Sequence, residues 1–134
     1  MGKNSLMPES VRSKTMGTIK ARLAHLTPNV CLIRLEGELD RTVLKDLVRF
    51  TDANLLVVET AVIIDMSELS YMDSSGIKFI YGLGSRFGYE NIAAYGIGDD
   101  LRRILDVVGL ADKISYLYKP EETARWRQAR RRAA

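Results

Sequence analysis

An acidic residue, two hydroxyls and a glycine stand together in the middle of the chain, in the order Asp73, Ser74, Ser75, Gly76. The preceding run 62–66 is apolar almost throughout, as in a strand buried on both faces, and the apolar residues that follow have helical spacing. The serines are therefore predicted at the carboxyl end of a strand and the N-terminus of a helix, where ligands and modifications lie in open α/β sheets. Free N–H groups and the positive end of the helix dipole favour an added anion there. A hydroxyl in this position is suited to a phosphorylation switch.

A second acidic residue, Asp40, has a similar setting. It follows segment 37–39 at the end of an earlier strand and precedes a helical pattern of apolar residues, so it is a candidate N-cap. If the two strands are parallel neighbours, their carboxyl ends lie at one edge of the sheet and Asp40 comes close to Ser74. The alternative interpretation is that Asp40, Asp73 and Ser75 are only helix caps, each contributing about 0.5–2 kcal/mol.

The side chains that most catalysts use are scarce. The chain has one histidine, His25, and one cysteine, Cys31, and its sequence shows no pattern of a Ser-His-Asp triad or a Cys-His pair. Cys31 lies in an apolar strand pattern and is interpreted as a buried structural thiol. His25 is interpreted as a surface or hydrogen-bonded side chain rather than a metal ligand or general base. We therefore predict that the chain is not an enzyme and that it uses no cofactor or metal.

Two short glycine motifs keep one alternative open. They are Gly82-Leu83-Gly84 and Gly96-Ile97-Gly98; neither extends to GxGxxG, and no Walker pattern is present. The Gly96–Gly98 junction lies between a predicted strand and a predicted helix. A weak nucleotide-site interpretation therefore stands beside the ordinary one, in which these are turn glycines.

Size and composition indicate an ordinary globular protein with one domain. The chain has 134 residues, of which 46% are hydrophobic and 28% charged. No apolar run reaches the roughly 18 residues of a membrane span, and no apolar signal-peptide core follows the N-terminus. These features predict a cytoplasmic protein without membrane insertion.

The positive charge of the chain is concentrated at its end. The formal net charge is +3, but five arginines fall in the last ten residues, and without them the net charge would be −2. A basic end is typical of nucleic-acid or anionic-lipid binding, but it also favours a terminal helix, because cations near a helix C-terminus complement its dipole. We expect the helix, without direct nucleic-acid binding.

The order of elements predicts an α/β fold with a mixed sheet of four to five strands and about four helices. The expected strands lie near 18–26, 30–35, 62–66, 92–97 and 114–118, the first two forming an antiparallel hairpin at the N-terminal edge. The expected helices follow Asp40, span about 75–87, follow an Asp99 or Asp100 cap up to Gly109, and begin at Pro120. Segment 55–61 fits either an extension of the helix after Asp40 or the approach to the strand at 62–66. Residues 1–17 are predicted to be a flexible extension, 18–122 the domain, and 123–134 a basic helix or tail.

Three blocks of sequence together resemble the STAS domains of bacterial anti-sigma-factor antagonists. They are Gly37–Asp40, Leu69–Gly76 and Leu101–Leu110, and the resemblance covers about residues 18–122. It implies a single STAS-like domain and a regulatory binding protein. In that family the unmodified antagonist binds an anti-sigma factor that is also a serine kinase, and this releases the sigma factor. The kinase phosphorylates the first hydroxyl after the aspartate, which weakens binding, and a serine phosphatase reverses the modification.

Carried onto this sequence, the resemblance implies phosphorylation at Ser74. Four matching neighbours, Asp40, Asp73, Ser75 and Gly76, would form the surroundings of the phosphosite and the partner-binding surface. Lys78 departs from the glycine of many relatives and puts a cation one helical turn from Ser74, where it could pair with a phosphate or a partner carboxylate. The alternative function is a STAS module that is never phosphorylated and acts as a scaffold or binds a nucleotide or other small ligand. The sequence carries no signal for an oligomeric state.

Overall fold

The computed structural model describes residues 6–8, 11–27, 29–55 and 59–133. Six strands within these ranges form one sheet, ordered as they occur in the chain. They are β1 (Arg12–Met16), β2 (Ile19–Thr27), β3 (Val30–Leu39), β4 (Ala61–Met72), β5 (Ile92–Tyr95) and β6 (Ser115–Leu117). The helices are α1 (Arg41–Asn54), α2 (Ser74–Phe87), α3 (Asp99–Val107) and α4 (Pro120–Ala133), with a 3-10 turn η1 (Tyr89–Asn91) after α2.

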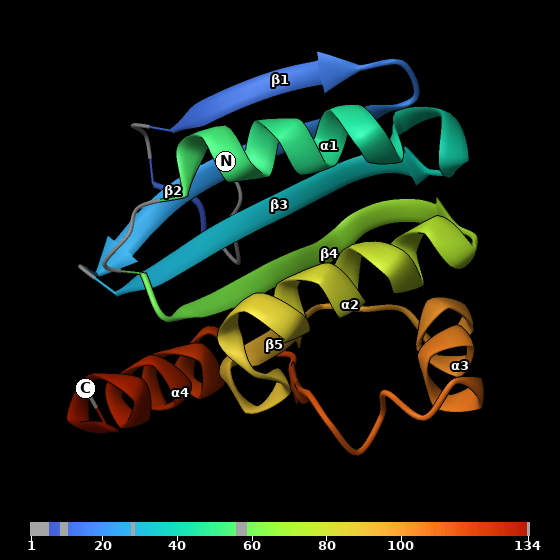
Figure 1. Cartoon of the computed structure of the whole chain (residues 1–134). Helices are drawn as coiled ribbons and strands as arrows, with labels where there is room; N and C mark the ends of the chain where they lie inside the picture. The colour runs from blue at the N-terminus through green and yellow to red at the C-terminus, as the bar shows by residue number, and fades with distance from the viewer. Residues whose placement is uncertain (1–5, 9–10, 28, 56–58, 134) are drawn as a thin grey trace.

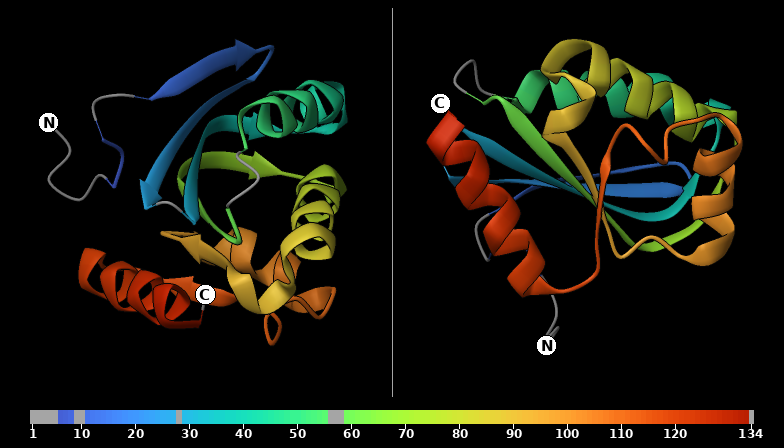
Figure 2. Two further views of the ribbon diagram at one scale, coloured as in Figure 1. Left: turned by 60° about the vertical axis from the view of Figure 1, so that its left-hand side comes forward. Right: turned by 90° about the horizontal axis from the view of Figure 1, so that it is seen from below.

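The sheet is mixed, as the sequence predicts. β1, β2 and β3 pair antiparallel, and β3 through β6 pair parallel. The crossover helices α1 and α2 cover one face of the sheet, and α4 lies on the opposite face (Figure 2). The first turns of α1 and α2 and the whole of α3 lie at the same end of the sheet, which is the carboxyl end of its parallel strands (Figure 1). Crossover connections between parallel strands explain why α1 and α2 begin at this end.

The strands pack through alternating side chains. Cys31, Ile33 and Leu35 point toward the α1–α2 face, whereas Val30 and Leu32 point toward α4. Residues 61–66 of β4 are all buried. The continuous apolar run therefore forms a central strand covered on both faces, as predicted.

The prediction of a flexible extension over residues 1–17 is wrong for residues 12–16, which form β1. The side chains of β1 are exposed except for Met16, so the segment shows no apolar alternation that would reveal a strand. Backbone pairing with β2 holds it in place, from Arg12 opposite Leu23 to Met16 opposite Ile19. Among the described residues the sheet consequently has six strands rather than four to five. Residues 1–5 lie outside the described part of the chain.

Strands β3 and β4 both run further than the apolar pattern indicates. β4 pairs with β5 only as far as Asp65, but it continues beside β3 up to Met72. In this second half most side chains are exposed, because β5 no longer flanks the strand. The extension carries the Asp-Ser-Ser-Gly segment out to the edge of the sheet. Of the ambiguous segment 55–61, residues 56–58 are outside the described ranges.

The structure corrects one helix cap and confirms another. The N-cap of α3 is Gly98, without a side-chain hydrogen bond, and not Asp99 or Asp100. Both aspartates follow Gly98 in the first turn of α3, where their negative charge interacts favourably with the positive end of the helix dipole. At the other end, Gly109 has φ of +80° and the Leu110 N–H donates to the Leu105 carbonyl at 2.9 Å. These features form a Schellman motif, and they confirm the predicted end of the helix near Gly109.

The basic C-terminal segment is helical and α4 begins at Pro120, both as predicted. Trp126 is buried against the second face of the sheet, and Arg130 stacks over its ring at 4.1 Å. Arg127 donates to the Leu26 carbonyl of β2. At least two arginines of the tail thus take part in packing α4. Among the described residues, no helix is both long and apolar enough to cross a membrane.

Candidate functional site

Asp40 and Asp73 occupy neighbouring positions at the carboxyl edge of the sheet. Leu39 of β3 is paired with Met72 of β4, so each aspartate directly follows one member of the pair. The Asp73 N–H donates to the Leu39 carbonyl at 3.3 Å, which ties the two strand ends together. Asp40 is the N-cap of α1 and Asp73 the N-cap of α2. The parallel pairing of these two strands, on which the predicted proximity of Asp40 and Ser74 depends, is confirmed.

The Asp40 carboxylate is held by its own helix. It accepts hydrogen bonds from the Thr42 hydroxyl at 2.6 Å and from the Thr42 N–H at 2.9 Å. The hydroxyl bond is the main reason why the pKa of Asp40 is lowered below its ordinary value; backbone N–H groups and Arg41 add to the effect. This edge of the sheet therefore carries a fixed negative charge next to α2.

The two hydroxyls that follow Asp73 have different environments. Ser74 is the first residue of α2 and is exposed. Ser75 is 2% exposed, and its N–H donates to the Asp73 carboxylate at 2.7 Å. A modifying enzyme needs access to the hydroxyl oxygen, so Ser74 is the accessible acceptor of the pair.

Gly76 lets the start of α2 lie directly on β4. A Cβ atom at this position would come within 2.0 Å of Met72 Cγ and 2.1 Å of its Sδ. Met72 is itself buried, so it has little room to move away. The glycine is thus explained by packing, and it fixes where Ser74 emerges from the surface.

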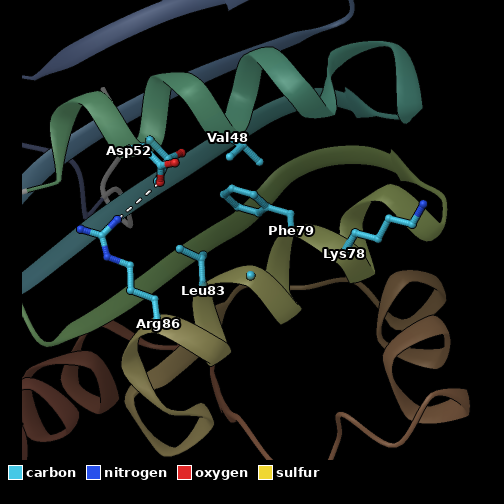
Figure 3. Close-up of a pocket in the computed structure, with 8 residues that line it drawn as sticks. Val48, Asp52, Lys78, Phe79, Leu83 and Arg86 are labelled. Carbon is cyan, nitrogen blue, oxygen red and sulfur yellow. Dashed lines mark hydrogen bonds and ion pairs between the residues drawn. The ribbon is translucent and has the colours of Figure 1, made fainter.

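Lys78 lies one turn beyond Ser74 on the exposed side of α2, beside a groove between α1 and α2. In Figure 3 its side chain extends away from the other labelled residues, toward the N-terminal end of α2. The groove holds a cavity of about 230 Å³, and an ion pair between Arg86 and Asp52 at 3.4 Å bridges the two helices across it. The lining residues are Val48, Thr51, Asp52, Lys78, Phe79, Gly82, Leu83 and Arg86.

Comparison with known proteins identifies the family. The STAS domain family model matches residues 22–124, which is most of the chain. The chain belongs to the STAS domain family. A comparison with curated protein sequences gave no match.

Three solved structures show what this STAS domain is similar to. The anti-sigma factor antagonist SpoIIAA in its unphosphorylated form is 25% identical, with a TM-score of 0.66, over 81% of this chain and 96% of the other. The phosphorylated form of the Bacillus cell fate determinant SpoIIAA is 25% identical, with a TM-score of 0.60, over 80% and 97%. An anti-sigma factor antagonist from Mycobacterium paratuberculosis shares the fold at 20% identity, with a TM-score of 0.67, over 78% and 89%.

The Gly96–Gly98 junction of this STAS domain borders a second, shallower depression of about 460 Å³ at the same end of the sheet. Its lining residues are Leu69, Ser70, Gly98, Asp99, Asp100, Leu101 and Arg103. Gly96 has φ of +68°, and a Cβ there would lie 2.8 Å from the Ser67 Cβ. The turn itself therefore requires this glycine. The two aspartates outnumber the one lining cation, Arg103, and the net negative charge of the lining does not favour a nucleotide phosphate.

Sequence reasoning missed the groove beside Lys78. Val48 and Asp52 are spaced i, i+4 on α1, and Lys78 and Arg86 lie on the exposed side of α2. This pattern indicates a solvated helix face and nothing more, because the contact between α1 and α2 is tertiary. Of the two glycines noted in α2, Gly84 makes room for the Tyr89 ring, whereas Gly82 has no neighbour within 4 Å and opens the groove.

Proposed function

We propose that this STAS domain is a phosphorylatable anti-sigma-factor antagonist of a partner-switching pathway. It binds an anti-sigma factor that is also a serine kinase, and phosphorylation of Ser74 switches this binding off; a serine phosphatase restores it. The observation that carries the proposal is the exposed Ser74 at the N-terminus of α2, next to two N-cap aspartates at one sheet edge. The similarity to SpoIIAA, solved in unphosphorylated and phosphorylated forms, supports it.

The surroundings of Ser74 make a phosphate tolerable to the fold and disruptive to an interface. A phosphoserine adds about −1.5 to −2 charges at pH 7. The N-terminus of α2 and the Lys78 ammonium one turn away attract that charge, while the Asp73 and Asp40 carboxylates repel it. The fold therefore stays intact, and a negative, bulky group replaces a small hydroxyl at the point of docking.

The surface offered to the partner runs from Ser74 along the α1–α2 groove. It combines apolar side chains in the groove, Val48 and Leu83, with charged ones at its margins, Lys78 and Arg86. A change in interface free energy of about 2.7 kcal/mol alters affinity a hundredfold. One phosphate at the edge of such a surface is enough for a switch, and no conformational change is required.

The proposal is tested by intact-mass analysis and peptide mapping of the protein from its native host, followed by phosphorylation with the cognate kinase and ATP. One phosphate is expected, on the peptide that contains Ser74, and Ser74→Ala should abolish its incorporation. The matched control is Ser70→Ala. Ser70 is also exposed at this edge, and its hydroxyl donates to the Gly37 carbonyl. A Ser74→Ala protein that is phosphorylated at the parental rate would contradict the assignment.

In this proposal the domain acts by binding, without catalysis, in the cytoplasm. The alternative function, a STAS module that is never phosphorylated and binds a nucleotide or acts as a scaffold, makes a different prediction for calorimetry. It predicts heat on titration with common nucleotides, and that heat should be lost in Arg103→Ala, since Arg103 is the cation that lines the Gly98 depression.

A further inference from the structure

The single histidine and the single cysteine of the chain converge on a buried carboxylate at the end of the sheet opposite Ser74. His25 of β2 and Cys31 of β3 are directly paired across the antiparallel ladder. Glu59, just before β4, lies beside them, and its Oε2 is 2.6 Å from the His25 Nδ1. One ligand atom from each of the three side chains falls within 4.8 Å of the other two. We propose that His25, Cys31 and Glu59 form a binding site for a Zn²⁺-like cation.

The donor types match those of a zinc site. Zn²⁺ takes thiolate sulfur at about 2.3 Å, imidazole nitrogen at about 2.0–2.1 Å and carboxylate oxygen at about 2.0–2.2 Å, in tetrahedral geometry. Those distances put neighbouring ligand atoms about 3.3–3.8 Å apart. The observed separations bracket this spacing: His25 Nδ1 and Glu59 Oε2 are 2.6 Å apart, and no two of the three ligand atoms are more than 4.8 Å apart. Three protein ligands leave the fourth position to water or to a partner's side chain.

The backbone around the cluster places the ligands without help from the metal. The strand register shifts between His25 and Thr27, and a β-bulge of this kind redirects the side chains beside it. The segment leading into β4 is pinned by the N–H groups of Thr60 and Ala61, which both donate to the Asn29 carbonyl at 2.8 and 3.2 Å. A bound cation would cross-link the β2–β3 hairpin to the start of β4.

The site has a route from solvent and can balance the charge of a divalent cation. The side chain of Glu59 is 0% exposed and Cys31 is fully buried, whereas the His25 side chain is 35% exposed and gives a route from solvent. Burial, and secondarily the Glu59 carboxylate, raise the pKa of the Cys31 thiol well above its ordinary value, so the metal-free thiol is protonated and a metal must displace its proton. A thiolate and a carboxylate together neutralise the two charges of Zn²⁺, which removes the cost of a buried net charge.

The site is tested by titrating the tag-free protein with Co²⁺ and then Zn²⁺. We expect one Co²⁺ per chain, with the visible bands of tetrahedral cobalt and an intense thiolate-to-cobalt absorption, both abolished by one equivalent of Zn²⁺. Because Cys31 is the one cysteine of the sequence, the thiolate band reports on this site alone. Zn²⁺ should also raise the melting temperature, since a ligand that binds only the folded state stabilises it.

Variants separate the site from general metal binding. Cys31→Ala should lose the thiolate band. His25→Gln changes a side chain that is 35% exposed, so the core should stay intact. It should weaken Co²⁺ affinity more than about 100-fold, because loss of even an outer-shell partner lowers metal affinity 10–100-fold. Asp100→Asn is the matched control; it removes a carboxylate from the exposed acidic pair at α3 and should leave the spectrum unchanged. Circular dichroism without metal checks that each variant is folded. No thiolate band in the parent, the same band in Cys31→Ala, or unchanged affinity in folded His25→Gln would overturn the proposal.

Discussion

At the scale of single residues, the two aspartates at the sheet edge carry both a structural and an electrostatic role. Each caps a helix through hydrogen bonds within two residues, and the pairing of Leu39 with Met72 brings both to the sheet edge where Ser74 begins α2. The two interpretations that the sequence left open are therefore not exclusive. Substitutions that keep the cap and remove the charge separate them.

Asp73→Ala should lower the free energy of unfolding by about 0.5–2 kcal/mol, because the Ser75 N–H loses its acceptor at the start of α2. Asp73→Ser retains a capping oxygen without the charge, so it should keep most of the stability while weakening the effect of phosphorylation on partner binding. Urea unfolding measures the first effect, and binding of the phosphorylated and unmodified forms measures the second. Equal destabilisation by alanine and serine would show that the cap is not what Asp73 contributes.

The pH dependence of Asp40 follows from its hydrogen bonds. Folding lowers the pKa of Asp40, so its contribution to stability is present above the unfolded pKa of about 3.9 and is lost as the pH falls through the lower folded pKa. Thr42→Val removes the hydroxyl bond that is the main cause, and should bring the pKa back toward its ordinary value. Thr42→Ser keeps a hydroxyl and serves as the control. NMR titration of the Asp40 carboxyl checks both variants, and an unchanged pKa in Thr42→Val would contradict the assignment.

At the scale of elements, helix α2 is shaped by glycines with opposite surroundings. Gly76 lies against Met72 and Gly84 against the Tyr89 ring, so both permit close packing. Gly82 faces the open groove with nothing within 4 Å. Packing therefore excludes a larger side chain at Gly76 and Gly84, whereas Gly82 has room for one.

Gly76→Ala should destabilise the protein by about 1–3 kcal/mol, since its Cβ overlaps a buried methionine. Gly82→Ala, in the interior of the same helix, should instead stabilise it by about 0.5–1 kcal/mol, because alanine loses less backbone freedom on folding. Thermal melts of the two variants compare them directly. Partner affinity of Gly82→Ala gives a second measurement: a loss there, in a more stable protein, would place the partner in the groove.

At the scale of the whole molecule, the two faces of the sheet are closed by parts of the chain that are far apart. α1 and α2 cover the larger core, and α4 closes the second face (Figure 2). Trp126 of α4 is buried in the core of that second face. The Trp126 indole N–H donates to the Ser115 hydroxyl of β6 at 3.2 Å. The basic C-terminal helix is therefore a structural layer of the domain.

Trp126→Ala should lower the free energy of unfolding by about 3–5 kcal/mol, the range for removal of a buried aromatic side chain. Arg125→Ala, an exposed change on the neighbouring residue of α4, should stay within about 0.5 kcal/mol of the parent. Denaturant unfolding followed by circular dichroism measures both. A Trp126→Ala protein as stable as the parent would mean that the packing of Trp126 against the sheet contributes nothing to the free energy of unfolding.

Much of the fold could be read from local patterns. The apolar run 62–66 marked the central strand, Asp40 and Asp73 marked the starts of α1 and α2, and Gly109 marked the end of α3. In each case the signal lies within a few residues, in a cap, a stop or a hydrophobic period. The Asp-Ser-Ser-Gly segment was recognisable for the same reason.

Other features of the molecule depend on contacts between distant segments. β1 is held by backbone pairing with β2, and its side-chain sequence shows no strand pattern. The groove at Lys78 exists because α1 packs beside α2. The choice of Ser74 over Ser75 as the accessible hydroxyl rests on burial under neighbouring elements. Glu59 joins His25 across 34 positions because the sheet brings β2 beside the start of β4. The local sequence determines the secondary-structure propensity of a segment, whereas contacts between distant segments are set by the register and packing of the sheet.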